Sequence, residues 1–329
     1  MGEVFFIVGR GRSGTTLLSR MLLKHSAIVV APEGFFAMSL ERRYGSGVWD
    51  ESRIDAFCRD LLLENRMRTW KLDVARLRSL LVPGVSTLDY AEVCRRVYAV
   101  YAEGVGRPEA AWLGDKNPHY ALLTSRIAAR FPCARFVHIV RDPRDNICSY
   151  RTVPFDVGNV AALAYRWRRY NEEILAAARA HPERFLRLRY EDLLADARRE
   201  LTRTCDFLGV AFEEAMLAFH EGGNEGFYGE RSRWFADLKK PLDAGRAERW
   251  RTHLPAASVR LADAICGPLA RELGYPVDGD TAAAASVKGW LGRGLGWGSV
   301  LAEKFVFDTL PVQLRSQLIN AYRRSSGRV

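Results

Sequence analysis

The sequence lacks the features of a membrane-spanning, disulfide-bonded or metal-binding protein. None of its apolar runs approaches the roughly 18 residues that a membrane-spanning helix needs. The cysteines stand singly, without the close pairs typical of zinc sites or redox dithiols. They are Cys58, Cys94, Cys133, Cys148, Cys205 and Cys266. We therefore expect no metal site, reduced and mostly buried thiols, and at most a peripheral contact with a membrane.

There is also little room for a signal peptide. An apolar run at residues 4–8 begins almost at the initiator methionine and leads directly into a glycine-rich turn. A secretory signal needs a charged segment, an apolar core and a cleavage site. We therefore expect a cytoplasmic protein, and leave membrane-peripheral attachment open.

Lysine is scarce, since only seven of the 49 basic residues are lysines. The acidic residues number 39, which gives a formal net charge of +10. Such a surface suits nucleic acid, an anionic membrane or a phosphorylated ligand equally well. Charge alone therefore does not choose the partner.

Four short runs of apolar residues, bounded by turn residues, predict buried strands. They lie at residues 4–8, 27–30, 135–140 and 185–188. Helical patterns lie between them, such as Leu17, Leu18 and Met21 after the first run. This alternation predicts an α/β fold of P-loop type, in which three layers place a central parallel sheet between helices.

The chain divides into three expected parts. Residues 1–276 are expected to form one domain, with a helical insertion at about 53–111 in which no strand is apparent. A stretch rich in Gly, Asp and Ala, residues 277–288, is the expected linker. Residues 289–329 are expected to form a helical, aromatic tail with six basic and two acidic residues.

Within the tail, Leu314, Leu318 and Tyr322 fall at helical spacing. This pattern favours a helix packed on the core or on a second subunit. Docking of the tail to a membrane is the second interpretation. The oligomeric state stays open.

The segment GRGRSGTT at residues 9–16 lies between an expected strand and an expected helix, which is the context of a phosphate-binding loop. Glycines let the backbone turn tightly, so that amides and the helix N-terminus face an anion. Thr15 stands where a nucleotide triphosphatase needs its lysine, and Arg12 supplies a cation instead. The loop therefore predicts a single 5′ phosphate with a leaving group, held by Arg12, Thr15 and Thr16.

A second passage from strand to helix, FVHIVRDPRDNICSYR at residues 136–151, predicts another anion site. Asp142 and Pro143 are typical of a helix cap and first turn. Arg141 lies at the carboxyl end of the strand, where ligands bind in open α/β sheets. Ser149 follows eight residues later, and a guanidinium and a hydroxyl so placed can hold a second phosphate.

Together these segments resemble the 5′-phosphosulfate loop and the 3′-phosphate motif of sulfotransferases that use 3′-phosphoadenosine 5′-phosphosulfate (PAPS). The similarity is greatest to the branch with tyrosylprotein sulfotransferases and many bacterial homologues. That branch also has counterparts of Lys116 in GDKNPHY, of Tyr190 in LRYEDLL, and of Lys239 and Lys240 before a proline and Trp250. The resemblance implies sulfuryl transfer from PAPS to an acceptor hydroxyl, with release of 3′-phosphoadenosine 5′-phosphate (PAP) and no metal requirement.

The resemblance also implies the roles of individual residues. Arg12 and Lys116 would stabilise the leaving phosphate oxygen, and Glu33 in APEGFF would be the general base. Apolar neighbours predict a raised pKa for Glu33. His119 is the alternative base, whereas His138 lies within a strand run and is expected in the core. The nucleotide contacts would be Arg12, Ser13, Gly14, Thr15, Thr16, Arg141, Ser149, Tyr190, Lys239 and Lys240, with Arg231 and Ser232 as looser candidates.

Two other functions compete with this interpretation. A P-loop small-molecule kinase would need the Walker lysine that Thr15 replaces. A module that binds nucleic acid or membrane would use the basic surface but leave the two phosphate motifs unexplained, so we expect no nucleic acid partner. The acceptor stays open among peptide tyrosine, glycan, lipid and small molecule.

Overall fold

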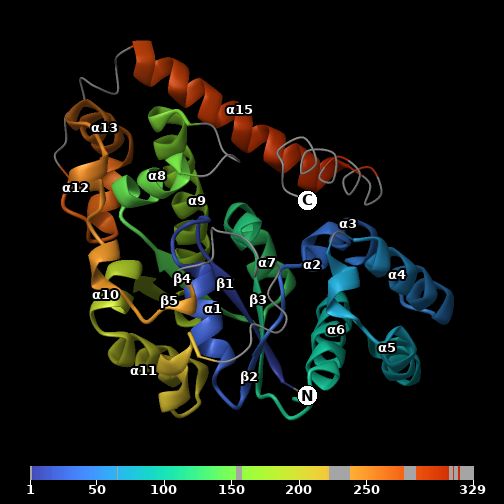
Figure 1. Ribbon diagram of the computed structural model, residues 1–329. Coiled ribbons are helices and arrows are strands. Elements are labelled where there is room, and N and C mark those ends of the chain that lie inside the picture. The colour runs from blue at the N-terminus through green and yellow to red at the C-terminus, as the bar shows by residue number, and fades with distance from the viewer. Residues whose placement is uncertain are drawn as a thin grey trace.

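The computed structural model describes residues 2–64, 66–152, 158–221, 238–277, 287–310, 314 and 318. Its central sheet has five parallel strands in the order β2-β3-β1-β4-β5 (Figure 1). They are β1 (Glu3–Val8), β2 (Ile28–Val30), β3 (Trp112–Lys116), β4 (Arg135–Val140) and β5 (Phe185–Arg189). The strand order requires crossovers between paired strands, and this confirms the predicted α/β fold.

Helices cover both faces of the sheet. One face is covered by α7 (Thr124–Arg130) and α9 (Val160–Ala180), and the other by α1 (Thr15–Leu23), α10 (Tyr190–Ala195) and α11 (Ala197–Leu208). Farther out, α12 (Trp250–His253) and α13 (Ala256–Glu272) pack against α8 (Pro143–Arg151), and α13 also packs against α9. Alternate residues of β1 face the two sides: Phe6 packs toward α7 and α9, whereas Phe5 and Ile7 pack toward α1 and α11. Burial on both sides explains why β1 is an unbroken apolar run in the sequence.

The strand β3 was not predicted, because WLGDK contains a glycine and two charged residues. All five of its residues are nevertheless buried. Gly114 is needed there, since a Cβ would come within 2.6 Å of the Phe5 ring. The Trp112 indole donates a hydrogen bond to the Leu208 carbonyl, 2.7 Å away. Tertiary contacts therefore make a strand of a sequence with weak strand propensity.

The predicted insertion at 53–111 is helical, but the helices begin earlier, at Phe36, so the insertion comprises the whole segment between β2 and β3 and forms the right-hand lobe in Figure 1. Its helices are α2 (Phe36–Ser39), α3 (Glu41–Tyr44), α4 (Glu51–Leu63), α5 (Val74–Leu81) and α6 (Tyr90–Gly104). Asp50, Asp73 and Asp89 cap α4, α5 and α6 by accepting a hydrogen bond from a backbone amide of the first turn. The apolar faces of these helices join the same core as Phe6.

The cysteines and His138 lie where the sequence led us to expect them. All six cysteines are free, and Cys58, Cys94, Cys205 and Cys266 are buried. His138 is also buried, and its ring nitrogen lies 3.0 Å from the side-chain oxygen of Asn171. Burial lowers the pKa of His138 to about 4, so the ring is neutral at pH 7.

The tail begins with α15 (Val287–Thr309), which packs along α9 (Figure 1). The pattern that favoured packing of the tail on the core lies beyond α15, and there Leu314 and Leu318 are exposed. Most of the expected linker, residues 278–286, and Tyr322 lie outside the described residues. Within the described parts of the chain, no helix combines the length and apolarity that crossing a bilayer requires.

We expect Phe6→Ala to lower the free energy of unfolding by about 3–5 kcal/mol, because it leaves a cavity in a close-packed core. The Phe6 ring is fully buried and stacks on Phe136, with Phe131 and Tyr120 at its edges. Urea unfolding would measure the change. Val48→Ala is the control, since Val48 is 83% exposed; equal effects of the two substitutions would contradict this account of the core.

Candidate active site

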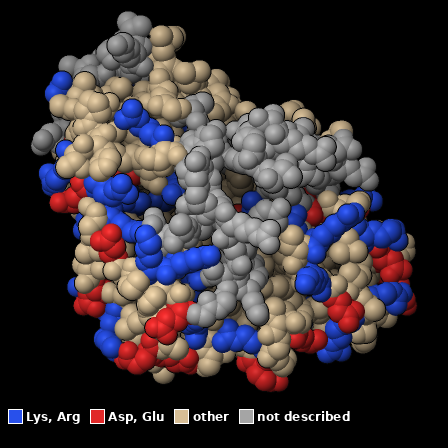
Figure 2. Space-filling view, viewed as in Figure 1, with Lys and Arg blue, Asp and Glu red and all other residues tan. Residues whose placement is uncertain are grey.

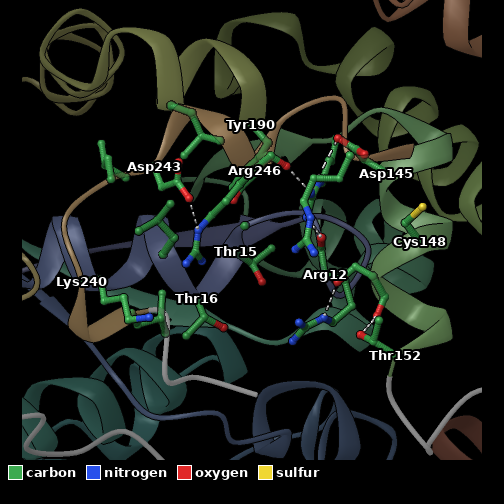
Figure 3. A pocket seen from close by; sticks show the side chains of 18 of the residues that line it. Arg12, Thr15, Thr16, Asp145, Cys148, Thr152, Tyr190, Lys240, Asp243 and Arg246 are labelled. Atoms are coloured by element: carbon green, nitrogen blue, oxygen red, sulfur yellow. Dashed lines mark hydrogen bonds and ion pairs between the residues drawn. The ribbon is translucent and has the colours of Figure 1, made fainter. Parts of the chain in front are cut away.

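A cavity of about 560 Å³ lies beyond the carboxyl ends of β1, β4 and β5 (Figure 3). This is the edge at which parallel α/β sheets bind ligands. Its wall carries more cations than anions: the basic residues are Arg12, Arg141, Arg151, Lys240, Arg246 and Arg249, and the acidic ones are Asp145 and Asp243. The cavity is therefore suited to a polyanionic ligand.

The phosphate loop forms one wall of this cavity. Arg12 has φ 66° and Gly14 has φ 97°, so the chain turns through left-handed conformations between β1 and α1. The Tyr190 ring packs so closely that a Cβ on Gly14 would lie 2.4 Å from it. Thr15 and Thr16 open α1 and line the cavity. The loop thus presents a guanidinium, two threonines and a helix N-terminus to one space, as predicted.

Ser13 lies on the other side of the loop. Its hydroxyl accepts a hydrogen bond from the Asn146 amide at 3.1 Å, and its backbone amide donates to the Arg10 carbonyl at 3.2 Å. Asn146 also donates to the Gly11 carbonyl at 3.0 Å. Ser13 is only 1% exposed and does not line the cavity. In this arrangement it fixes the loop to α8, which differs from the predicted nucleotide contact.

The second motif meets the first across the cavity. As predicted, Asp142 caps α8, accepting a hydrogen bond from the Arg144 amide, and Pro143 is the first helical residue. The Arg12 Nε donates to the Ser149 Oγ at 3.0 Å. The Arg141 guanidinium lies 4.4 Å from the centre of the Tyr190 ring and donates to the Arg246 carbonyl at 2.9 Å. Residues far apart in the sequence therefore form one continuous wall (Figure 3).

The YED triplet after β5 supports this wall in two ways. Tyr190 lies between the Arg141 guanidinium and Gly14. Glu191 accepts a hydrogen bond from the Asp142 amide at 3.0 Å and another from the Tyr275 hydroxyl at 2.8 Å. The carboxylate thereby holds the turn that positions Arg141.

The segment around Lys239 and Lys240 approaches the same cavity from the C-terminal part of the domain. Lys240 lines the cavity, whereas Lys239 is exposed and does not. Arg231 and Ser232 lie outside the described residues.

Arg246 and Arg249 line the cavity but were not predicted from the sequence. They stand between the lysine pair and Trp250, inside a segment already singled out. The chain has too many arginines for these two to stand out by residue type alone.

A cluster of charged residues lies where β2, β3 and the insertion meet. The carboxylate of Glu33 pairs with Lys116 on one oxygen and with Arg66 on the other. Lys116 is 4% exposed in its side chain and also lies 3.3 Å from the Thr16 hydroxyl. Glu33 and Lys116, two of the three predicted catalytic residues, are thus in contact, and Lys116 also contacts Thr16 of the phosphate loop. Arg66, from the insertion, was not predicted.

The expected raised pKa of Glu33 is wrong. Burial does raise the pKa, but Lys116 and Arg66 outweigh it through charge attraction and hydrogen bonds, and hold the pKa far below the usual range of a glutamate. The apolar sequence neighbours misled the prediction, because the cations come from β3 and from residue 66 of the insertion. Glu33 is therefore ionised at neutral pH.

A buried network behind this cluster fixes its geometry. Asp115 is fully buried and accepts a hydrogen bond from the Tyr98 hydroxyl at 2.5 Å. The Tyr120 hydroxyl lies 2.8 Å from the same carboxylate and 3.2 Å from the Gly34 carbonyl. Burial raises the pKa of Asp115 to about 7, against the effect of these hydrogen bonds. Tyr120 thus bridges Asp115, which precedes Lys116, and Gly34, which follows Glu33. This bridge sets the distance between Lys116 and Glu33.

His119, the alternative base, follows β3 by three residues. Its backbone amide donates to the Asn117 side chain at 3.1 Å, and its ring meets the Phe35 ring edge-on at 6.1 Å. His119 does not line the cavity, and neither do Glu33 and Lys116. In the described part of the chain, no three His, Cys, Asp or Glu residues are arranged to hold a metal ion.

Comparison with known proteins gives consistent results. Residues 5–214 match the sulfotransferase family. Protein-tyrosine sulfotransferase 1 of Danio rerio is 23% identical over 286 residues, which cover 83% of this chain and 72% of that protein. Carbohydrate sulfotransferase 7 of Rattus norvegicus is 36% identical over 98 residues, 30% of this chain and 20% of that protein.

Among solved structures, the sulfotransferase domain of the olefin synthase from Synechococcus PCC 7002 has a TM-score of 0.57. It is 26% identical, and the match covers 84% of this chain and 96% of that domain. The similarity in fold therefore extends over most of the described chain.

We expect Glu33→Gln to lower the free energy of unfolding by about 2 kcal/mol at pH 7, because Lys116 and Arg66 lose their anionic partner. A carboxylate with a depressed pKa contributes stability above its unfolded-state pKa of about 4.5, and this contribution is lost as the pH falls below that value. Urea unfolding between pH 7 and 3.5 would measure the free energy of unfolding of wild type and variant. The difference between the two should shrink only at the acidic end of this range. A difference that grew toward low pH would contradict the ion-pair cluster.

Proposed function

The chain belongs to the sulfotransferase family and is an enzyme of that class, and we propose that it transfers the sulfuryl group of PAPS to an acceptor hydroxyl and releases PAP. The hydrogen bond between Arg12 and Ser149 carries this proposal, because it joins the two anion-binding motifs at one cavity. A donor with phosphates at both its 5′ and 3′ positions needs two such motifs at a fixed separation.

The cavity has the size and charge for such a donor. Its volume of about 560 Å³ falls within the roughly 300–1,000 Å³ of small-molecule sites. Arg12, Thr15 and Thr16 would hold the 5′ phosphosulfate at the N-terminus of α1. Arg141 and Ser149 would hold the 3′ phosphate, with Lys240 and Arg246 adding positive charge.

The Glu33 cluster lies next to the loop that would hold the phosphosulfate, through the contact of Lys116 with Thr16. We assign Glu33 as the base that accepts the proton of the acceptor hydroxyl. The acceptor oxygen forms a bond to sulfur while the bond from sulfur to the 5′ phosphate oxygen breaks. Arg12 and Lys116 stabilise the negative charge that develops on that leaving oxygen.

A carboxylate with a very low pKa is a weak base, so the paired state of Glu33 is not the reacting state. Lys116 can resolve this by turning from Glu33 toward the donor's bridging oxygen, since it already reaches Thr16. The departure of one cation would raise the pKa of Glu33 just when a base is required. Donor binding would thus activate the base.

The acceptor approaches Glu33 from the side of the insertion, which supplies Arg66. The relatives include a protein-tyrosine sulfotransferase and a carbohydrate sulfotransferase. A peptide tyrosine and a sugar hydroxyl are therefore the first acceptors to try.

We expect PAP to bind the purified protein without magnesium, and Arg12→Ala and Arg141→Ala each to raise the Kd about 10- to 100-fold, because each removes a charged hydrogen-bond donor. Calorimetric titration would measure this. AMP, which lacks the 3′ phosphate, should bind much more weakly, and Arg141→Ala should affect AMP less than PAP. Arg43→Ala is a matched control, because Arg43 is exposed and pairs with Asp60 in the insertion.

Binding of magnesium ATP with no binding of PAP would overturn this proposal and favour the P-loop kinase. That outcome would require another cation in place of the lysine that Thr15 replaces.

We expect Glu33→Gln to lower kcat about 10²- to 10⁴-fold, the usual effect of losing a general base. His119→Ala should change kcat only a few-fold. A tyrosine peptide, an oligosaccharide and a simple phenol would first be tried as acceptors. The assay would then measure transfer of the labelled sulfuryl group from PAPS to the acceptor that reacts. A larger loss in His119→Ala than in Glu33→Gln would assign the base to His119 instead.

A further inference from the structure

The outer face of α15 is an apolar surface that the proposed catalysis does not use. On the inner face, a Cβ on Gly292 would lie 2.3 Å from Cβ of Ala161, and one on Gly296 would lie 3.0 Å from the Ala162 carbonyl. Val300 is 6% exposed and joins the main core. These contacts with α9 fix the rotation of the helix about its axis, so the opposite face points outward.

That outward face is composed of large apolar residues. Trp290 is 67% exposed, Trp297 57% and Phe305 55%. With 3.6 residues per turn, the exposed apolar positions of α15 fall within roughly 160° of arc. They are Trp290, Leu291, Leu295, Trp297, Leu301 and Phe305. Farther along the tail, Leu314 and Leu318 are exposed as well.

We propose that this face of α15, defined by those six residues, docks the protein on the surface of an anionic lipid bilayer. Tryptophan and phenylalanine with leucine on one side of a helix are typical of helices that lie in the plane of a membrane interface. The helix forms a ridge across the top of the molecule in Figure 1, so it can lie flat on a planar surface. This proposal is independent of the acceptor and of the catalytic assignment.

Charge complementarity selects an anionic bilayer as the partner. Residues 289–329 contain six basic and two acidic residues, and the whole chain has a formal charge of +10. The described surface at the upper left of Figure 2, around α13 and the beginning of α15, shows blue among tan residues and hardly any red. A basic surface beside an apolar ridge is attracted to anionic headgroups before the side chains insert.

The same charge disfavours a second copy of this chain as the partner. Each copy has a formal charge of +10, and like charges oppose association of two copies. The ridge is also a single helix wide, whereas a stable dimer usually needs about 800 Å² on each partner.

The test is flotation of the purified full chain with vesicles of phosphatidylcholine alone and of phosphatidylcholine with 30% phosphatidylglycerol. We expect binding to the anionic vesicles, and weaker binding at 0.5 M salt because the headgroup attraction is screened. The double substitution Trp297→Asp and Leu301→Asp should weaken binding about tenfold or more, since charges enter the apolar ridge.

Val48→Asp is the matched control, since it adds a charge at an apolar residue that is 83% exposed in the insertion. It should bind vesicles like the wild type. Thermal unfolding and PAP binding of the double variant should also match the wild type, which separates loss of docking from loss of fold.

Two outcomes would overturn the proposal. One is equal flotation of wild type and double variant, or none with either vesicle. The other is a dimer in solution, measured by light scattering, that the double substitution dissociates; the ridge would then bind a second copy.

Discussion

Parallel pairing of β1 with β3 on one side and β4 on the other is the constraint on which the candidate site depends. Ile7 pairs with Lys116, and Val8 pairs with His138, three residues before Arg141. Because all three strands run in one direction, the phosphate loop, the lysine and the arginine leave the sheet at one edge. Arg12, Lys116 and Arg141 therefore converge at the edge where parallel α/β sheets bind ligands.

The convergence of cations also explains why the Glu33 carboxylate is ionised and ion-paired. Several positive charges close together repel one another, and a carboxylate between Lys116 and Arg66 relieves that repulsion. An anionic donor would offer Lys116 a competing partner. In the proposed mechanism, the ion pair that stabilises the protein without donor would restrain the base until the donor is present, so that one cluster would serve both stability and proton transfer.

The two motifs could be predicted from sequence because each is local: a strand, a tight turn and the start of a helix follow one another in each segment. The first turn is rich in glycine, and the second has the helix cap Asp142 followed by Pro143. The strand β3 and the partners of Glu33 could not, because they depend on contacts between distant residues. In the sequence, Gly114 argues against a strand. In the fold a glycine is required there, because the Phe5 ring packs directly against it. Arg66 is one of many arginines in the sequence, and only the fold brings it to Glu33, which follows β2. The domain boundaries and the cytoplasmic location stay predictions.

The glycines of α15 determine how this helix packs on the core and therefore which of its residues are exposed. A helix with so many glycines has a low intrinsic propensity to form, so it depends on its contacts with α9. Gly292 and Gly296 allow those contacts only along one side, and the large apolar residues are therefore forced to the other side. An outward row of tryptophan, leucine and phenylalanine exposes apolar surface to water, which is unfavourable for a protein that remains free in solution. A lipid interface removes that cost, because the same residues are then buried among headgroups and acyl chains.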